Sequence, residues 1–173
     1  MISEIRTAME KELYLSALTL ALTLPDTCGR AEYPNEKVGK RYKDWCKEYV
    51  ITDKNDSPYG CDMPYLNEEI IYSLRNSLLH QSTPNIEQSK ISEERCKVDK
   101  FELVASKDIS ANGDLSMVSY GAGMNIVHRE LQVHISHLCY ILCEAAESYY
   151  KNNKEKFNFI NYYLVDEKSD ETF

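Results

Sequence analysis

Arginine and histidine stand five positions apart in the segment Arg75-Asn76-Ser77-Leu78-Leu79-His80. A histidine has an ordinary pKa of about 6.5, so it can accept or donate a proton near neutral pH. An arginine guanidinium can hold a phosphate and stabilise charge that develops in a transition state. Asn76 can orient the imidazole or bind a phosphate oxygen. We therefore take His80 as a candidate general acid–base, Arg75 as an electrostatic stabiliser and Asn76 as their support.

A helix is predicted to carry these three side chains, from Asn67 to about His80 and ending before Pro84. Asn67 is a good capping residue, because its side chain can accept hydrogen bonds from the first free backbone N–H groups. Glu68 and Glu69 follow it, where the positive end of the helix dipole favours acids. The segment therefore has the features of a well-defined helix start.

The apolar spacing of this helix predicts which side faces the core. At about 100° per residue, Ile71, Leu74 and Leu78 fall on one face. Asn76 and His80 are neighbours one turn apart, nearly opposite that face, and the arginine lies to the side. We expect the polar side chains to face solvent, another segment or another subunit.

The rest of the chain is predicted to be mainly helical. Helices are expected over residues 2–24, 36–50, about 131–152 and 154–163, and short strands over 101–105, 115–120 and 124–127. Pro25 is expected to end the first helix, with Asp26–Gly29 as a turn, and Asn112-Gly113 to form a hairpin turn between the first two strands. We predict one domain over residues 1–164, with a β excursion at about 100–128, and an acidic tail over 165–173.

The net charge of −8 comes from 28 acidic and 20 basic side chains. Proteins that coat nucleic acid need lysine and arginine for the phosphates, so extended, non-specific DNA or RNA binding is not expected. A small site that admits one or two nucleotides is compatible with this charge.

The six cysteines are spread along the chain, at Cys28, Cys46, Cys61, Cys96, Cys139 and Cys143. No secretory signal supports a disulfide framework. The apolar run 13–24 is preceded by acids, and it is shorter than the roughly 20 residues that span a bilayer. We predict a cytoplasmic protein with reduced thiols and no membrane association.

Histidine and cysteine also gather over His134, His137, Cys139 and Cys143. All four lie within ten residues on one predicted helix, and no second cluster such as C-x2-C exists to complete a zinc site. Cysteines four apart on a helix are usually small core residues. We predict no metal and no cofactor.

The stretch Arg75–His80 matches R-x(4–6)-H, and the chain thereby resembles the HEPN superfamily. The asparagine after the arginine and the position of the motif at the end of a capped helix strengthen this likeness. With its β excursion before the last long helix, the whole chain looks like an uncharacterised bacterial branch. The resemblance implies an up-and-down helical bundle.

In the resembled family two subunits pair through the motif helix and bring both motifs into one cleft. This implies a homodimer that cleaves RNA without metal or cofactor, through an attacking ribose 2′-OH and a 2′,3′-cyclic phosphate product. Phage defence or a toxin–antitoxin pair is the implied setting, with an antitoxin or nucleotidyltransferase as partner. Some HEPN toxins carry a modified tyrosine two residues after the histidine. Ser82 stands there in this chain, so such silencing is not expected.

Two other interpretations stay open. One is a HEPN dimer without catalysis that binds a nucleotide or a partner protein. The other is a helical interaction protein in which the motif is accidental and Arg75 pairs with Glu68, Glu69 or an acid on another helix.

Further residues are candidates for supporting roles. Asp26, Arg30 and Glu32 follow the first predicted helix and either fold against the motif or serve the turn. The basic residues of the second predicted helix are either a solvated face or a rim that guides RNA, and they include Lys37, Lys40 and Arg41.

Overall fold

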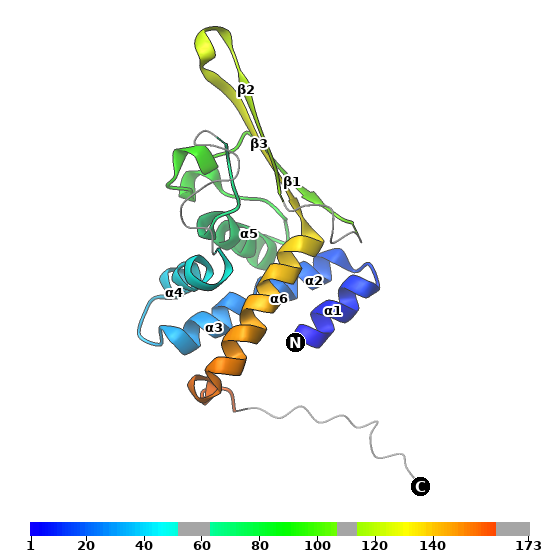
Figure 1. Cartoon of the computed structure of the whole chain (residues 1–173), viewed down its shortest axis with the longest axis vertical. Helices are drawn as coiled ribbons and strands as arrows, with labels where there is room; N and C mark the ends of the chain where they lie inside the picture. Colours follow the sequence, from blue (N-terminus) through cyan, green and yellow to red (C-terminus); the bar gives the residue numbers. More distant parts are fainter. Residues whose placement is uncertain (52–62, 107–113, 162–173) are drawn as a thin grey trace.

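The computed structural model describes residues 1–51, 63–106 and 114–161 (Figure 1). This part of the chain is mostly helical and carries one small sheet, which confirms a mainly α fold. The α-helices are α1 (Ile2–Glu10), α2 (Tyr14–Ala21), α3 (Leu24–Glu32), α4 (Val38–Trp45), α5 (Glu68–Gln81) and α6 (Ile135–Asn152). The strands are β1 (Lys100–Val104), β2 (Leu115–Tyr120) and β3 (Ile126–His134).

Short helical turns join these elements. A π-helical turn, Cys46–Val50, continues α4, so the predicted helix over 36–50 is found with a change of pitch. The remaining turns are 3₁₀-helical: Gln88–Lys90, Glu94–Cys96, Ala122–Met124 and Lys154–Phe157. In the described part of the helix predicted over 154–163, a single turn is helical. The predicted acidic tail over 165–173 lies outside the described residues.

The prediction of one long helix over residues 2–24 was wrong, because α1, α2 and the start of α3 share that stretch. Glu12 has a φ of 59° between α1 and α2, which a continuous helix does not allow. Pro25 lies in the first turn of α3, where its missing N–H removes no helical hydrogen bond. Pro25 therefore begins a helix, and the predicted turn at Asp26–Gly29 is part of α3.

Helix α5 confirms its prediction closely. The Asn67 side chain accepts hydrogen bonds from the backbone N–H of Glu69 (3.1 Å) and of Ile70 (2.9 Å). At the other end Ser82 adopts a left-handed conformation and terminates the helix. Of the predicted core residues on this helix, Ile71 and Leu74 are buried and Leu78 is partly buried.

The sheet has the order β1-β3-β2, with β1 parallel and β2 antiparallel to β3. The predicted hairpin between the first two strands was wrong, because β3 lies between them. The hairpin joins β2 to β3 instead, through a turn closed by a hydrogen bond from Gly121 N–H to the Asn125 carbonyl (2.8 Å). Asn112-Gly113 lies outside the described residues.

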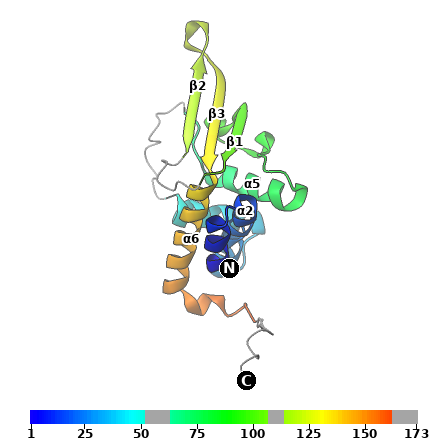
Figure 2. The same cartoon turned by 90° about the vertical axis from the view of Figure 1, so that its right-hand side faces the viewer.

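Strand β3 also explains why the last long helix begins later than predicted. Leu131 and Val133 are buried and paired with β1, so residues 131–134 are extended and α6 starts at Ile135. The far end of the β2–β3 hairpin projects away from the helices (Figures 1 and 2).

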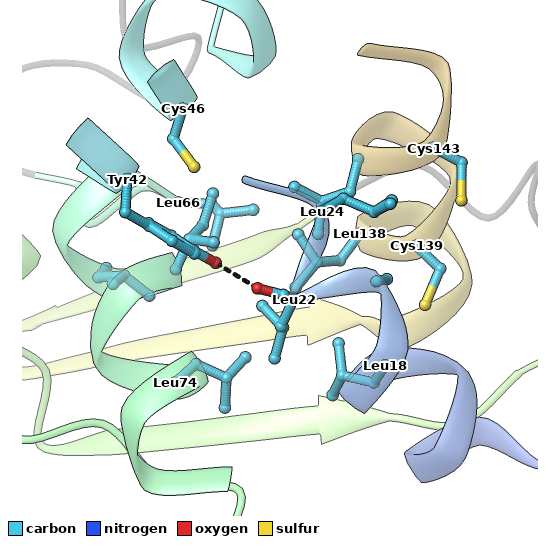
Figure 3. Close-up of a cluster of buried hydrophobic side chains, with 14 of the residues drawn as sticks. Leu18, Leu22, Leu24, Tyr42, Cys46, Leu66, Leu74, Leu138, Cys139 and Cys143 are labelled. Atoms are coloured by element: carbon cyan, nitrogen blue, oxygen red, sulfur yellow. Dashed lines mark hydrogen bonds between the residues drawn. The ribbon is translucent and has the colours of Figure 1, made fainter. Parts of the chain in front are cut away.

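The core forms where α2, α3, α5 and α6 meet (Figure 3). Leu18, Leu22, Leu74 and Leu138 are buried there. The buried Tyr42 hydroxyl donates a hydrogen bond of 3.0 Å to the Leu22 carbonyl, which ties α4 to the end of α2. In the described part of the chain, no helix is long and apolar enough to cross a membrane.

Candidate functional site

Arg75 is the centre of a small polar cluster at the candidate site. Its Nε and Nη2 atoms lie 3.0 Å and 2.9 Å from Oδ2 of Asp26. Its Nη1 atom donates to Oδ1 of Asn76 at 2.9 Å and lies 3.1 Å from Nε2 of His80. One guanidinium therefore contacts the other two residues of the motif and a carboxylate from another helix.

Two helices build this cluster. Helix α5 presents Arg75, Asn76 and His80 near its C-terminal end, and α3 presents Asp26 from its first turn. The helix dipole favours a carboxylate in a first turn, which suits Asp26 at the start of α3. The cluster thus depends on α3 beginning at Leu24, which places Asp26 in its first turn.

The cluster is shielded at one end and open at the other. The side chains of Arg75 and Asp26 are only 15% and 21% exposed, whereas His80 is exposed. Tyr42 is buried close enough to Asp26 and Arg75 for their charges to act on it. Burial raises the pKa of the Tyr42 hydroxyl well above the usual range. Its hydroxyl is therefore neutral, and the imidazole is the accessible group.

The contact between Arg75 and His80 constrains the state of the imidazole. A guanidinium has only donors, so Nε2 of His80 must be the acceptor. An imidazole that accepts at Nε2 is neutral and carries its proton on Nδ1. In this arrangement His80 has the protonation state of a general base.

Of the three candidate supporting residues, only Asp26 contacts the motif. Glu32 accepts hydrogen bonds from the Tyr149 hydroxyl (2.5 Å) and Lys156 Nζ (2.6 Å). The guanidinium of Arg30 lies 4.4 Å from the ring centroid of Phe159. The first turn of α3 therefore contacts the cluster, whereas its last turn contacts α6 and the residues that follow α6.

Glu68 and Glu69, the two acids at the start of α5, are not the partners of Arg75. Glu69 accepts hydrogen bonds from the backbone and hydroxyl of Ser92 and lies 3.8 Å from Lys43 Nζ. The acid that pairs with Arg75 is Asp26, on another helix. This ion pair was one of the alternatives for the motif, and it coexists with the contacts to Asn76 and His80.

The candidate RNA-guiding residues differ in how much charge they leave uncompensated. Lys40 pairs with Glu36 (3.1 Å) and Asp44 (2.9 Å) within its own helix region. Lys37 is exposed, and neither it nor Arg41 forms an ion pair within the described ranges. A guiding role therefore suits Lys37 and Arg41 better than Lys40.

The structure does not bring the histidines and cysteines near α6 together as metal ligands. His134 belongs to β3, whereas His137, Cys139 and Cys143 belong to α6. Burial raises the pKa of Cys139 to about 12 and that of Cys143 to about 11, so both thiols stay protonated. Among the residues that the structure describes, no group of three or more metal-binding side chains occurs.

Comparison of the chain with protein-family models, with curated proteins and with solved structures finds no match. The side chains of the cluster themselves indicate its chemistry. A guanidinium beside an exposed, neutral imidazole is an arrangement suited to binding a phosphate and accepting a proton next to it.

Proposed function

We propose that the chain is a HEPN-type endoribonuclease that cleaves RNA without a metal ion, at a site where two copies pair through α5. The observation that carries this proposal is the 3.1 Å contact between Arg75 Nη1 and His80 Nε2. It joins a phosphate-binding cation to a general base at the accessible end of a helix. The mainly helical fold with a β excursion before α6 agrees with a HEPN-like bundle.

The first chemical step is proton transfer to His80. A phosphate oxygen that binds the Arg75 guanidinium competes for Nη1 and frees Nε2 of the imidazole. Nε2 then takes the proton of the ribose 2′-OH, whose oxygen attacks the adjacent phosphorus. The bond from phosphorus to the 5′ oxygen breaks, and that oxygen takes a proton from the second copy's imidazole, which enters the step protonated and therefore without the contact to its own guanidinium. The products are a 2′,3′-cyclic phosphate and a 5′-hydroxyl.

Arg75 supplies the electrostatic part of this reaction. The phosphorane-like transition state gathers negative charge on its non-bridging oxygens, and a fixed guanidinium stabilises that charge. The arginine is held in place before substrate arrives, because Asp26 accepts from both Nε and Nη2. Asp26 and Asn76 are thus positioning residues.

The exposure of His80 at the end of α5 supports the proposed pairing of two copies there. The imidazole is exposed and the Arg75 side chain is mostly covered, so one protomer offers only part of a cleft to an RNA backbone. A second copy of α5 across a twofold axis would add the missing wall and the proton donor for the leaving group. Phage defence, or pairing with an antitoxin, is the setting that we propose for such an enzyme.

A second candidate is a HEPN dimer that binds a nucleotide or partner protein without cleavage. One observation favours it: Asp26 already neutralises the guanidinium within the same protomer. With a net charge of −8, the chain also has little general attraction for RNA. An accidental motif in an interaction protein would likewise contain the ion pair, but it gives no reason for the contact to His80.

Incubation of the purified chain with a mixed RNA pool tests the proposal. Cleavage in the presence of EDTA, with 2′,3′-cyclic phosphate ends, is the expected result, and His80→Ala should abolish it. His128→Ala is the matched control, because His128 is half-exposed on β3 and its variant should cleave like the wild type. Equal background in the wild type and His80→Ala would exclude the nuclease and leave the binding candidate.

A further inference from the structure

A cavity lies between α1 and α6 and shares no residue with the Arg75 cluster. Its volume is about 480 Å³, within the range of small-molecule pockets. Apolar and sulfur-bearing side chains make most of its wall: Ile5 and Met9 from α1, and Cys139, Tyr140 and Cys143 from α6.

The cavity exists because α6 presents small side chains toward α1. Ser136, Cys139 and Cys143 are spaced three and four residues apart, and the two thiols leave the same side of the helix (Figure 3). The larger Leu138 and Leu142 of α6 are fully buried in the core. The space is partly open to solvent, so it is a surface pocket and not an interior void.

A buried hydroxyl in the wall of the cavity lacks a partner. Ser136 is 2% exposed, and its Oγ makes no hydrogen bond with the described residues. Buried hydroxyl groups are nearly always hydrogen-bonded, because leaving one unpaired loses the bond it made to water. The Ser136 oxygen itself is closed to solvent, so Ser136 belongs to the inner wall of the cavity.

The charges at the rim indicate the sign of that molecule. The Arg6 guanidinium is held by Glu144 at 3.0 Å and Glu147 at 2.8 Å, so its charge is compensated. Glu10 also lines the cavity, is exposed, and forms no ion pair in the described part of the chain. The surplus charge at the opening is a carboxylate, which attracts a cation and repels an anion.

The geometry points to a binding site for a small amphipathic cation, with an aromatic or aliphatic body and a primary ammonium group. The body fills the space between Met9 and the two thiols, where sulfur atoms pack well against aromatic rings. The ammonium group lies at the opening near Glu10. This site is independent of RNA cleavage.

Calorimetric titration of the full chain tests the site with three probes of one shape. 4-Phenylbutylamine carries the cation, 4-phenylbutanol is neutral and 4-phenylbutanoate is an anion. The amine should bind saturably to one site, about tenfold more tightly than the anion, because attraction to Glu10 is replaced by repulsion. Putrescine, which has the charge without the apolar body, should not bind measurably.

Three variants separate the parts of the proposal. Glu10→Gln is a surface change and should weaken amine binding about threefold while leaving the alcohol unchanged. Ser136→Ala should leave both amine binding and the fold unchanged, since it removes an unpaired hydroxyl that is closed to solvent. Cys143→Phe should fill the cavity and abolish binding of all three probes. Glu12→Gln is the matched control for Glu10.

The proposal fails if the folded wild type shows no saturable heat with the amine, or if the anion binds as tightly as the amine. It also fails if Glu10→Gln binds the amine as tightly as the wild type and the control Glu12→Gln do. Because RNA cleavage uses none of these residues, loss or retention of nuclease activity does not change this outcome.

Discussion

Arg75 Nη1 lies 3.1 Å from His80 Nε2, and this contact turns two residues five positions apart on one helix into a single unit. The same guanidinium is anchored by Asp26, 49 positions earlier in the chain. The imidazole is thereby held next to a fixed cation and keeps an unprotonated nitrogen. Two predictions follow from this arrangement directly, and two more concern the elements that maintain it.

Arg75→Lys should lower the rate of RNA cleavage by about a hundredfold or more, although the positive charge is kept. A lysine ammonium is a point donor and cannot span Asp26, Asn76 and His80 as the planar guanidinium does. Single-turnover cleavage at saturating RNA measures this loss. Arg6→Lys, on the exposed face of α1, is the control and should cleave normally; equal rates for the two variants would show that the guanidinium shape is irrelevant.

Asp26→Asn should reduce stability by about 1–3 kcal/mol and the cleavage rate by about tenfold. The variant leaves a partly buried guanidinium without its counter-charge and lets Arg75 move away from His80. Urea denaturation gives the first quantity and cleavage assays the second. Asp44→Asn removes an exposed carboxylate that pairs with Lys40, and it should change stability by less than about 0.5 kcal/mol. Wild-type behaviour of Asp26→Asn in both assays would remove Asp26 from the account.

Asn67→Ala should destabilise the protein by about 1–2 kcal/mol, because Asn67 Oδ1 is the acceptor for two N–H groups at the start of α5. The change lies at the opposite end of α5 from His80, so cleavage by the folded fraction should persist. Thermal and urea unfolding measure the loss. Asn35→Ala, in an exposed turn, provides the comparison, and an equal effect of both changes would contradict the capping role.

The contact network of Glu32 predicts part of the acid sensitivity of the fold. Hydrogen bonds from Lys156 and Tyr149 lower the pKa of Glu32 below its ordinary value of 4.5. The folded state therefore holds this proton less tightly than the unfolded state. The stabilisation is present above about pH 5 and is lost as the pH falls below 4.5 through the folded-state pKa.

Glu32→Gln should accordingly be less stable than the wild type at pH 7 and lose less stability on acidification to about pH 3. Urea midpoints at both pH values measure this difference. Parallel pH profiles for the two proteins would show that Glu32 does not titrate as described.

The local features of α5 could be predicted from the sequence, because its cap, its apolar face and its end depend on residues within one helix. The position of Asp26 could not. Pro25 suits either the end of one helix or the first turn of the next, and only the packing of α3 against α4 and α6 decides between these. The sequence alone therefore did not identify which of several acids pairs with Arg75.

The order of the sheet could not be predicted for a related reason. Strand positions follow from local composition, but β1 pairs with β3 in parallel across 30 positions of sequence. The nearest turn signal, Asn112-Gly113, favoured a pairing of β1 with β2 that does not occur. Leu131 is buried on the central strand, and the strand with which it pairs there lies 30 positions away in the sequence.

The central claim is that Arg75 and His80 of two copies form one RNA-cleaving site. Its most direct test is the cleavage rate of a fixed amount of wild type refolded together with an excess of His80→Ala chains, beside the same amount of wild type refolded alone. A site that takes its base from one copy and its acid from the other predicts that the mixture loses most of the activity, because most wild-type chains are then paired with a chain that lacks the second imidazole. A mixture as active as the wild type alone would contradict a site shared between two copies, and an inactive wild type would contradict the nuclease itself.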